Sequence, residues 1–430
     1  MMMMMGKKRR LMMMMEEGLP HDVVEHIMER LPVRSLLRFK SVSKQWKTTI
    51  ESRNFQERQL KHEESGGRDP DVLMATESSQ RRYVLGSSSS VKIPNPWGKE
   101  NPTTGYFVSD NSCDGLVCLY HPLESGYVFN PATRWYRPLP LCQLQQVRMS
   151  QGESYFELGH GLFKLGFGKD KITSTYKPVW LYNSSEIGLD NATTCEVFDF
   201  GANAWRYVTP SAPYRVVGVA DPVFVHGSLH WLTDCVETKV VSFDLHTEAF
   251  QLVSSKTPFP ANSHDENPYS IVLCNLDNRL CVSHMKWPDQ VIWSFNSGNK
   301  TWEKLYSIDL VMNSCCFDCS TICAFRPLLL VDGGKKKKKK NLLFYDTVSS
   351  PYLLIHDPEI QPDLFTFRLT SFVSRFLVLV SFLLLCFGCS KLDTLLLMRH
   401  QQYFLVNSLM HALYKYVCVG SHFQLFVSTT

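Results

Sequence analysis

Four cysteines stand close together in the last third of this 430-residue chain, and their thiolates are suited to binding a metal. They are Cys315, Cys316, Cys319 and Cys323. The C-x₂-C-x₃-C spacing fits a fragment of a zinc or iron–sulfur site. A structural zinc site needs a second ligand pair a dozen or more residues away, and the sequence has no such pair there. The alternative is four small buried hydrophobic side chains, and we therefore expect no metal and no cofactor.

Other catalytic patterns are incomplete. Gly166 and Gly168 lack the third glycine of a dinucleotide site and the Lys-Ser/Thr of a phosphate loop. No G-x-S-x-G elbow is present. His226 and His230 alternate along a predicted strand, as surface or core histidines do, and nothing marks one thiol as activated. The sequence therefore predicts no catalytic residue.

Composition and charge exclude several classes of protein. The chain is 44% hydrophobic and 20% charged, which is typical of globular proteins and excludes wholesale disorder. The net charge of +4 comes from residues 1–70, with 14 basic and 10 acidic side chains. The rest is balanced despite the solvated run Lys335–Lys340, so we expect no nucleic-acid partner. No apolar leader follows the basic cluster Lys7–Arg10, and the cysteines form no disulfide framework, which predicts a cytoplasmic or nuclear protein.

Changes in pattern divide the chain into five parts. These are a low-complexity tail (1–18), a helical module (19–58), a polar linker (61–104), a β-rich domain (105–360) and an apolar tail (364–430). The linker contains one strand-like run at Val72–Met74. The spacing predicts an α+β multidomain protein in which the helices precede the strands.

The helical module carries more apolar surface than it can bury. Leu19, Val23, Ile27 and Leu31 recur every four residues and form one apolar stripe, and Pro32 ends that helix. Trp46 lies on a further stripe. A unit of about 40 residues is near the lower limit for independent folding. We therefore expect part of this surface to stay exposed and to bind a partner.

The string LPHDVVEHIMERLPVRSLLRFKSVSKQWKTTIESRNF, from Leu19 to Phe55, resembles an F-box. The resemblance implies a three-helix motif that docks on a Skp-type adaptor and, through it, on a cullin ubiquitin ligase. Carried over residue by residue, it assigns adaptor binding to Leu19, Pro20, Val23, Ile27, Leu31, Pro32, Leu36, Leu37 and Trp46. It also implies that Trp46 and Ile50 hold the motif together.

Five segments of the β-rich part repeat one phrase, in which an aromatic residue is followed by an Asn, Asp or Gly turn and a second apolar pair. Their aromatic residues are Phe129, Phe198, Phe243, Phe295 and Tyr345. Each phrase predicts a β-hairpin, and spacings of about 45–50 residues are typical of propeller blades. The fold expected is an all-β propeller-like domain, and the alternative is a β-sandwich.

Two further strings resemble the F-box-associated domain of plant F-box proteins. They are SCDGLVCLYHPLESGYVFNPATRWYRPLP (112–140) and KLGFGKDKITSTYKPV (164–179). FVHGSLHWL (224–232) is similar too, with His226 where the family often has Asn. This resemblance implies a kelch-like domain that recruits substrates, although no substrate-binding residue can be named.

The apolar tail contains Leu369–Gly388, which is long enough to cross a bilayer, although Arg375 lies inside it. We expect an atypical terminus here without membrane insertion.

The sequence thus predicts a non-catalytic substrate-recognition subunit of an SCF-type ubiquitin ligase, which recruits an unknown protein for ubiquitination. Two alternatives stay open. One is a metal-binding propeller enzyme that uses the Cys315–Cys323 cluster, and the other is a membrane-tethered interaction protein.

Overall fold

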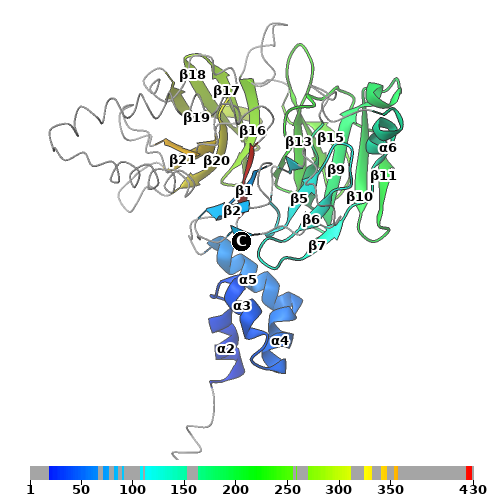
Figure 1. Cartoon of the computed structure of the whole chain (residues 1–430). Helices are drawn as coiled ribbons and strands as arrows, with labels where there is room; N and C mark the ends of the chain where they lie inside the picture. The colour runs from blue at the N-terminus through cyan, green and yellow to red at the C-terminus, as the bar shows by residue number, and fades with distance from the viewer. Residues whose placement is uncertain are drawn as a thin grey trace, which may run out of the picture.

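The computed structural model separates the chain into a helical module and a β domain, with the module projecting from one end of the domain (Figure 1). The residues that it describes are 19–65, 71–76, 82–85, 90–91, 107–109, 112–152, 163–254, 258, 270–310, 324–331, 340–345, 353–356 and 423–428.

Four short helices make up the helical module. They are α2 (His21–Met28), α3 (Val33–Phe39), α4 (Lys44–Glu51) and α5 (Arg53–Ser65). Pro20 and Pro32 directly precede α2 and α3, where a missing N–H costs no helical hydrogen bond. The Ser43 hydroxyl accepts from Trp46 N at 3.1 Å and caps α4. The sequence predicted three helices, and α5 adds a fourth that extends into the expected linker.

The strands of the described residues form six antiparallel sheets. Each sheet is named here by its innermost strand, which is the strand at the edge nearest the centre of the domain. The β4 sheet contains β4 (Phe107–Val108), β5 (Val117–Tyr120), β6 (Tyr127–Phe129) and β7 (Tyr136–Pro138). The β8 sheet contains β8 (Gly166–Lys169), β9 (Tyr176–Asn183), β10 (Thr193–Asp199) and β11 (Ala204–Val208). The β12 sheet contains β12 (Val223–Val225), β13 (Ser228–Leu232), β14 (Val240–Asp244) and β15 (Phe250–Leu252).

The other three sheets complete the domain. The β16 sheet contains β16 (Ile271–Leu276), β17 (Arg279–Lys286), β18 (Asp289–Asn296) and β19 (Thr301–Asp309). The β20 sheet contains β20 (Arg326–Val331), β21 (Asn341–Tyr345) and β22 (Leu353–His356). The β23 sheet contains β23 (Phe423–Ser428), β1 (Asp71–Thr76), β2 (Arg82–Leu85) and β3 (Ser90–Val91), in that order.

Neighbouring sheets meet through their innermost strands. Strand β8 contacts β12, β12 contacts β16, β16 contacts β20, β20 contacts β23, and β23 contacts β4. Sheets arranged in this way surround a common axis, as the blades of a propeller do. The propeller-like fold expected from the sequence is confirmed, and the β-sandwich alternative is not.

Apolar side chains fill the spaces between the sheets. One core lies between the β4, β8 and β12 sheets, and two others lie farther round the ring. Gly168 belongs to the first core, where an added Cβ would lie 2.5 Å from the Phe224 ring. Strand β8 therefore needs glycine there to approach the β12 sheet, which accounts for this residue without a phosphate loop.

The repeated phrase corresponds to one turn that closes the outer hairpin of four sheets. The first residue of the turn accepts backbone N–H groups with its side-chain oxygen, and the fifth residue has a positive φ. The accepting residues are Asn130, Asp199, Asp244 and Asn296. The residues with positive φ are Arg134, Asn203, Glu248 and Lys300. Asn and Asp recur at the first position because they satisfy the turn's amides.

Aromatic pairs join the two strands of these hairpins. The ring centroids of Phe198 and Trp205 are 5.3 Å apart, and those of Phe243 and Phe250 are 4.6 Å apart. All five phrases form the predicted antiparallel hairpins. The longest spacing, between Phe129 and Phe198, contains the additional helix α6 (Gln143–Ser150) and the short 3₁₀ helix η2 (Ser184–Ile187).

Two segments that the sequence places outside the β domain contribute strands to it. Strands β1, β2 and β3 lie within 61–104, and β23 lies within 364–430. Strand β23 pairs with β1 along its whole length, from Asp71 opposite Ser428 to Thr76 opposite Phe423. The two strands are far apart in sequence, so no local pattern indicates this pairing.

His226 is also placed differently from the prediction. It lies in the two-residue turn between β12 and β13 and does not alternate with His230 along a strand. His226 and Gly227 have φ values of 52° and 87°. Such a turn favours Asn-Gly, which explains why Asn suits this position.

We expect His230 to make the β domain sensitive to acid. Its Nδ1 lies 3.2 Å from the Val223 carbonyl oxygen, and burial lowers the pKa of His230 to about 4. The unfolded chain, with a histidine pKa near 6.5, binds more protons between pH 6.5 and 4. This contribution to stability is complete above about pH 6.5 and is lost as the pH falls towards 4, amounting to roughly 3 kcal/mol.

Urea unfolding at pH 7 and pH 4.5 tests this expectation. The His230→Asn variant keeps an N–H donor but does not titrate, so it should lose less stability on acidification than the unaltered protein. Equal losses in the two proteins would contradict the assignment.

Candidate functional site

The helical module has a small core of its own. Met28, Leu36, Ile50 and Phe55 are buried there, one from each helix. The Phe39 and Trp46 rings pack beside them with centroids 5.5 Å apart. Trp46 is half-buried, and its position supports the structural role that the sequence suggested.

Ion pairs fasten α5 to α2. The Arg58 guanidinium pairs with the Glu25 carboxylate, and its Nε lies 2.9 Å from Glu29 Oε1. The His21 imidazole also contacts the Thr49 hydroxyl at 2.9 Å, which joins α2 to α4. The sequence gave no signal for these contacts, because they join residues on different helices.

An exposed apolar row remains on the outside of the module. Leu19, Val23 and Ile27, which we call the apolar row, are 63%, 39% and 47% exposed. Val23 and Ile27 are four residues apart and lie on one side of α2, and Leu19 lies two residues before the helix begins. Val42, between α3 and α4, is also exposed. The expectation that the module leaves apolar surface uncovered is confirmed.

The structure places the nine expected adaptor-binding residues in three environments. The residues open to solvent are Leu19, Pro20, Val23, Ile27 and Pro32. Leu31, Leu37 and Trp46 are half-buried. Leu36 is only 4% exposed and belongs to the core. A buried side chain cannot contact a partner directly, so Leu36 supports the surface from beneath.

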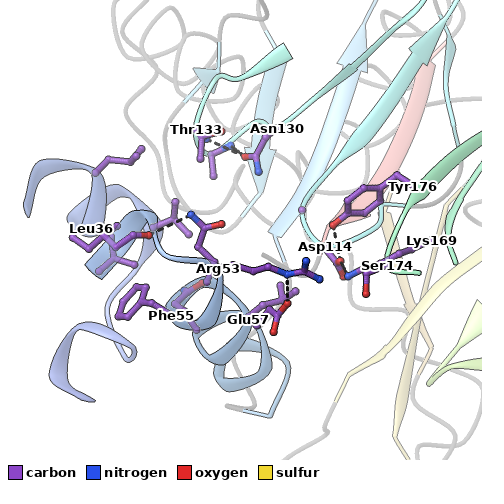
Figure 2. A pocket seen from close by; sticks show the side chains of 18 of the residues that line it. Leu36, Arg53, Phe55, Glu57, Asp114, Asn130, Thr133, Lys169, Ser174 and Tyr176 are labelled. Carbon is purple, nitrogen blue, oxygen red and sulfur yellow. Dashed lines mark hydrogen bonds and ion pairs between the residues drawn. The ribbon is translucent and has the colours of Figure 1, made fainter. Parts of the chain in front are cut away.

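A cavity of about 570 Å³ lies between the helical module and the β domain (Figure 2). Helices α3, α4 and α5 supply one wall, including Leu36, Leu37 and Phe55. The opposite wall comes from the turns that follow strands β4, β6 and β8. The module therefore faces the end of the domain at which the innermost strands finish.

Charged side chains on the cavity walls are paired within each part. Asp114 Oδ2 accepts hydrogen bonds from Lys169 Nζ at 2.5 Å and from the Tyr176 hydroxyl at 2.7 Å (Figure 2). Burial and the contact with Asp114 raise the pKa of Tyr176. On the helical wall, Arg53 Nε lies 2.7 Å from Glu57 Oε1, and this hydrogen bond lowers the pKa of Glu57. Opposite charges are neutralised locally, so these walls present no uncompensated charge to a ligand.

The described residues hold no cluster of three or more potential metal ligands. The Cys315–Cys323 group lies outside the described residues, as do Lys335–Lys339 of the lysine run and the apolar stretch Leu369–Gly388. Within the described part of the chain, no helix combines the length and the apolar character needed to cross a membrane.

Comparison with known protein families identifies both parts of the chain. The model of the F-box domain matches residues 17–58, and that of the F-box associated beta propeller domain matches residues 72–360. The chain belongs to the F-box protein family. The second match begins at the strands of the β23 sheet, within the segment expected to be a linker.

Several F-box proteins of Arabidopsis thaliana are similar to this chain. An F-box/LRR-repeat/kelch-repeat protein is 60% identical over 352 residues, covering 80% of this chain and 90% of its own. An F-box protein is 50% identical, covering 80% and 79% of the two chains. Another is 46% identical, covering 82% and 95%. The resemblances to the F-box and to the plant F-box-associated domain are confirmed.

The contrast between Leu36 and Ile27 can be tested by truncation of each side chain. Leu36→Ala removes buried methyl groups and should destabilise the F-box by about 2–4 kcal/mol. Ile27→Ala removes a side chain that is largely in water, and we expect a loss below about 1 kcal/mol. Hydrogen exchange of peptides from residues 19–65 in increasing urea, followed by mass spectrometry, measures both changes in the F-box itself, and an equal loss in the two variants would contradict this division.

Proposed function

We propose that the protein is the substrate-recognition subunit of an SCF-type cullin ubiquitin ligase. The observation that carries the proposal is the apolar row on an F-box whose own core is already filled. Burial of apolar surface contributes about 25 cal/mol per Å², so a partner that covers the row gains affinity from it. The F-box family match supports a Skp-type adaptor as the partner, with a cullin bound through it.

The proposed adaptor surface contains Leu19, Pro20, Val23, Ile27, Leu31 and Pro32. Five of these six are exposed, and Leu31 is half-buried at the end of the same surface. Leu37 lines the cavity beside the β domain, and Leu36 and Trp46 belong to or pack on the core. We assign these last three a supporting role in adaptor binding.

The β domain is proposed to hold a protein target. In this arrangement the assembly keeps a target lysine near the thioester of a ubiquitin-conjugating enzyme. The rate then rises through proximity and effective concentration, which require no acid, base or nucleophile from this chain. We accordingly propose a non-catalytic receptor that acts in the cytoplasm, the nucleus or both.

Carboxylates placed in the apolar row should abolish adaptor binding. In Leu19→Asp/Ile27→Asp, two charges would have to be buried at the interface, and we expect affinity to fall by at least about 100-fold. Co-purification of the full chain with a co-expressed Skp-type adaptor measures the loss. Leu189→Asp/Val236→Asp is a matched control, since it adds the same charge to exposed apolar positions of the β domain. Equal recovery of adaptor with both variants would refute the proposal.

The same variant separates target binding from ligase assembly. Because the β domain is unaltered, Leu19→Asp/Ile27→Asp should still capture the target but should lose the cullin. Quantitative mass spectrometry of affinity-captured material from plant cells compares it with the unaltered chain. Loss of target and cullin together would show that the two parts do not act separately.

A further inference from the structure

Charged side chains from three sheets meet at the end of the β domain that faces away from the F-box. The F-box faces the turns that follow β4 and β8, whereas the interactions of Lys164, Phe107, Asp221 and Arg326 bring the starts of β8, β4, β12 and β20 together. Lys164 lies two residues before β8, Asp221 lies two residues before β12, and Arg326 begins β20. All three therefore belong to the opposite end of the axis.

The contacts of these residues bring them together across the axis. Arg326 Nη1 donates to Asp221 Oδ2 at 2.5 Å, although the β16 sheet separates their sheets around the ring. Lys164 Nζ lies 4.1 Å from the centroid of the Phe107 ring, at the start of β4. We call Lys164, Asp221, Arg326 and Phe107 the axial cluster.

The axial cluster contains two cationic side chains and one carboxylate, and these side chains are largely shielded from solvent. The side chains of Arg326 and Asp221 are only 10% and 19% exposed. Burial lowers the pKa of Lys164, while Asp221 opposes that change. Among the described residues, the Lys164 ammonium has no oxygen partner, and its recorded contact is the Phe107 ring.

We propose that the axial cluster binds an acidic side chain of the target protein. This inference rests on the proposed function, because it names the chemistry by which the receptor recognises its substrate. A carboxylate can accept a charge-assisted hydrogen bond from Lys164 Nζ, the cation of the cluster that has no oxygen partner among the described residues. A phosphate carries about −1.5 to −2, so Asp221 repels it more strongly than it repels a carboxylate, which carries one negative charge.

Exposed apolar side chains at the same end favour a polypeptide over a free anion. Leu189, Val236 and Trp287 lie in the connections between the second and third strands of the β8, β12 and β16 sheets. In an antiparallel sheet these connections lie at the end where the innermost strand begins. A target segment can therefore place its acidic side chain at the axis and its apolar neighbours on these residues.

Two pools of capped seven-residue peptides test the proposal. One pool has a central Asp or Glu, and the other has a central Asn or Gln with the same flanking residues. The full chain, bound to its adaptor, is incubated with both, and retained peptides are counted by mass spectrometry. We expect the acidic pool to be enriched at least about tenfold, as a charge-assisted hydrogen bond allows. Equal retention of the two pools would overturn the proposal.

Substitutions at the cluster should act in opposite directions. Lys164→Met keeps the length of the side chain and removes the charge, so enrichment should be lost. Asp221→Asn removes the competing carboxylate, so enrichment should persist or increase. Lys286→Met removes an exposed charge at the end of β17 and serves as the matched control without effect. Lys164→Gln replaces the Met variant if the latter misfolds, as judged by circular dichroism. Unchanged enrichment in a folded Lys164 variant would refute the assignment.

Competition distinguishes a free anion from a protein side chain. Sodium phosphate at about 10 mM should not displace the acidic pool. This concentration suits weak anion binding, with a Kd of about 1 mM. Sodium chloride at equal ionic strength serves as the control. Displacement by phosphate would assign the cluster to a small anion instead. Adaptor capture by the Lys164 variants should be unchanged, so failure of the axial site and failure of the adaptor role give different results.

Discussion

Burial of sheet faces is the constraint on which this molecule depends. A four-stranded antiparallel sheet cannot cover both of its faces by itself, and here each sheet covers those of its neighbours around an axis. The cores between sheets follow from this arrangement, as does the glycine that lets β8 approach the β12 sheet. The F-box does not share in these cores and faces the domain across a cavity lined by both parts. Its stability comes from four buried side chains and from the ion pairs of Arg58.

The arrangement of strands also separates the two ends of the axis chemically. At the F-box end, Asp114 is neutralised by Lys169, and the turns are closed by their own side chains. At the far end, Arg326 pairs with Asp221, and Lys164 lies over the Phe107 ring. The proposed receptor holds its target on one side and its ligase on the other, and the two ends of the ring differ in the way that this requires. The function proposed here thus uses a polarity that is already present in the backbone.

Local patterns in the sequence were sufficient to predict much of this structure. The apolar positions four residues apart identified the exposed row on α2, because a helix places such residues on one side. The aromatic residue followed by Asn or Asp identified four hairpins, because the turn amides need that side-chain oxygen. Leu36 was placed on the adaptor surface by the F-box resemblance alone, and its burial could not be predicted because it depends on how the four helices pack together.

Contacts between distant residues could not be predicted in this way. The pairing of β1 with β23 joins segments that are more than three hundred residues apart. Neither segment has a sequence pattern that indicates which strand it pairs with. The ion pair of Asp221 with Arg326 exists only because the ring brings the starts of the β12 and β20 sheets together. No sequence pattern therefore indicated that the four residues of the axial cluster lie close together.

The pairing of β1 with β23 has a consequence for biosynthesis. During translation the F-box leaves the ribosome first, and its helices need only local contacts to form. The ring cannot close until the strand at Phe423–Ser428 has been synthesised, because that strand separates β1 from β4 and β20. Long-range pairing of this kind slows folding, and an incomplete ring has an open edge. A nascent chain therefore presents the proposed adaptor surface well before it has finished the domain that is proposed to select a target.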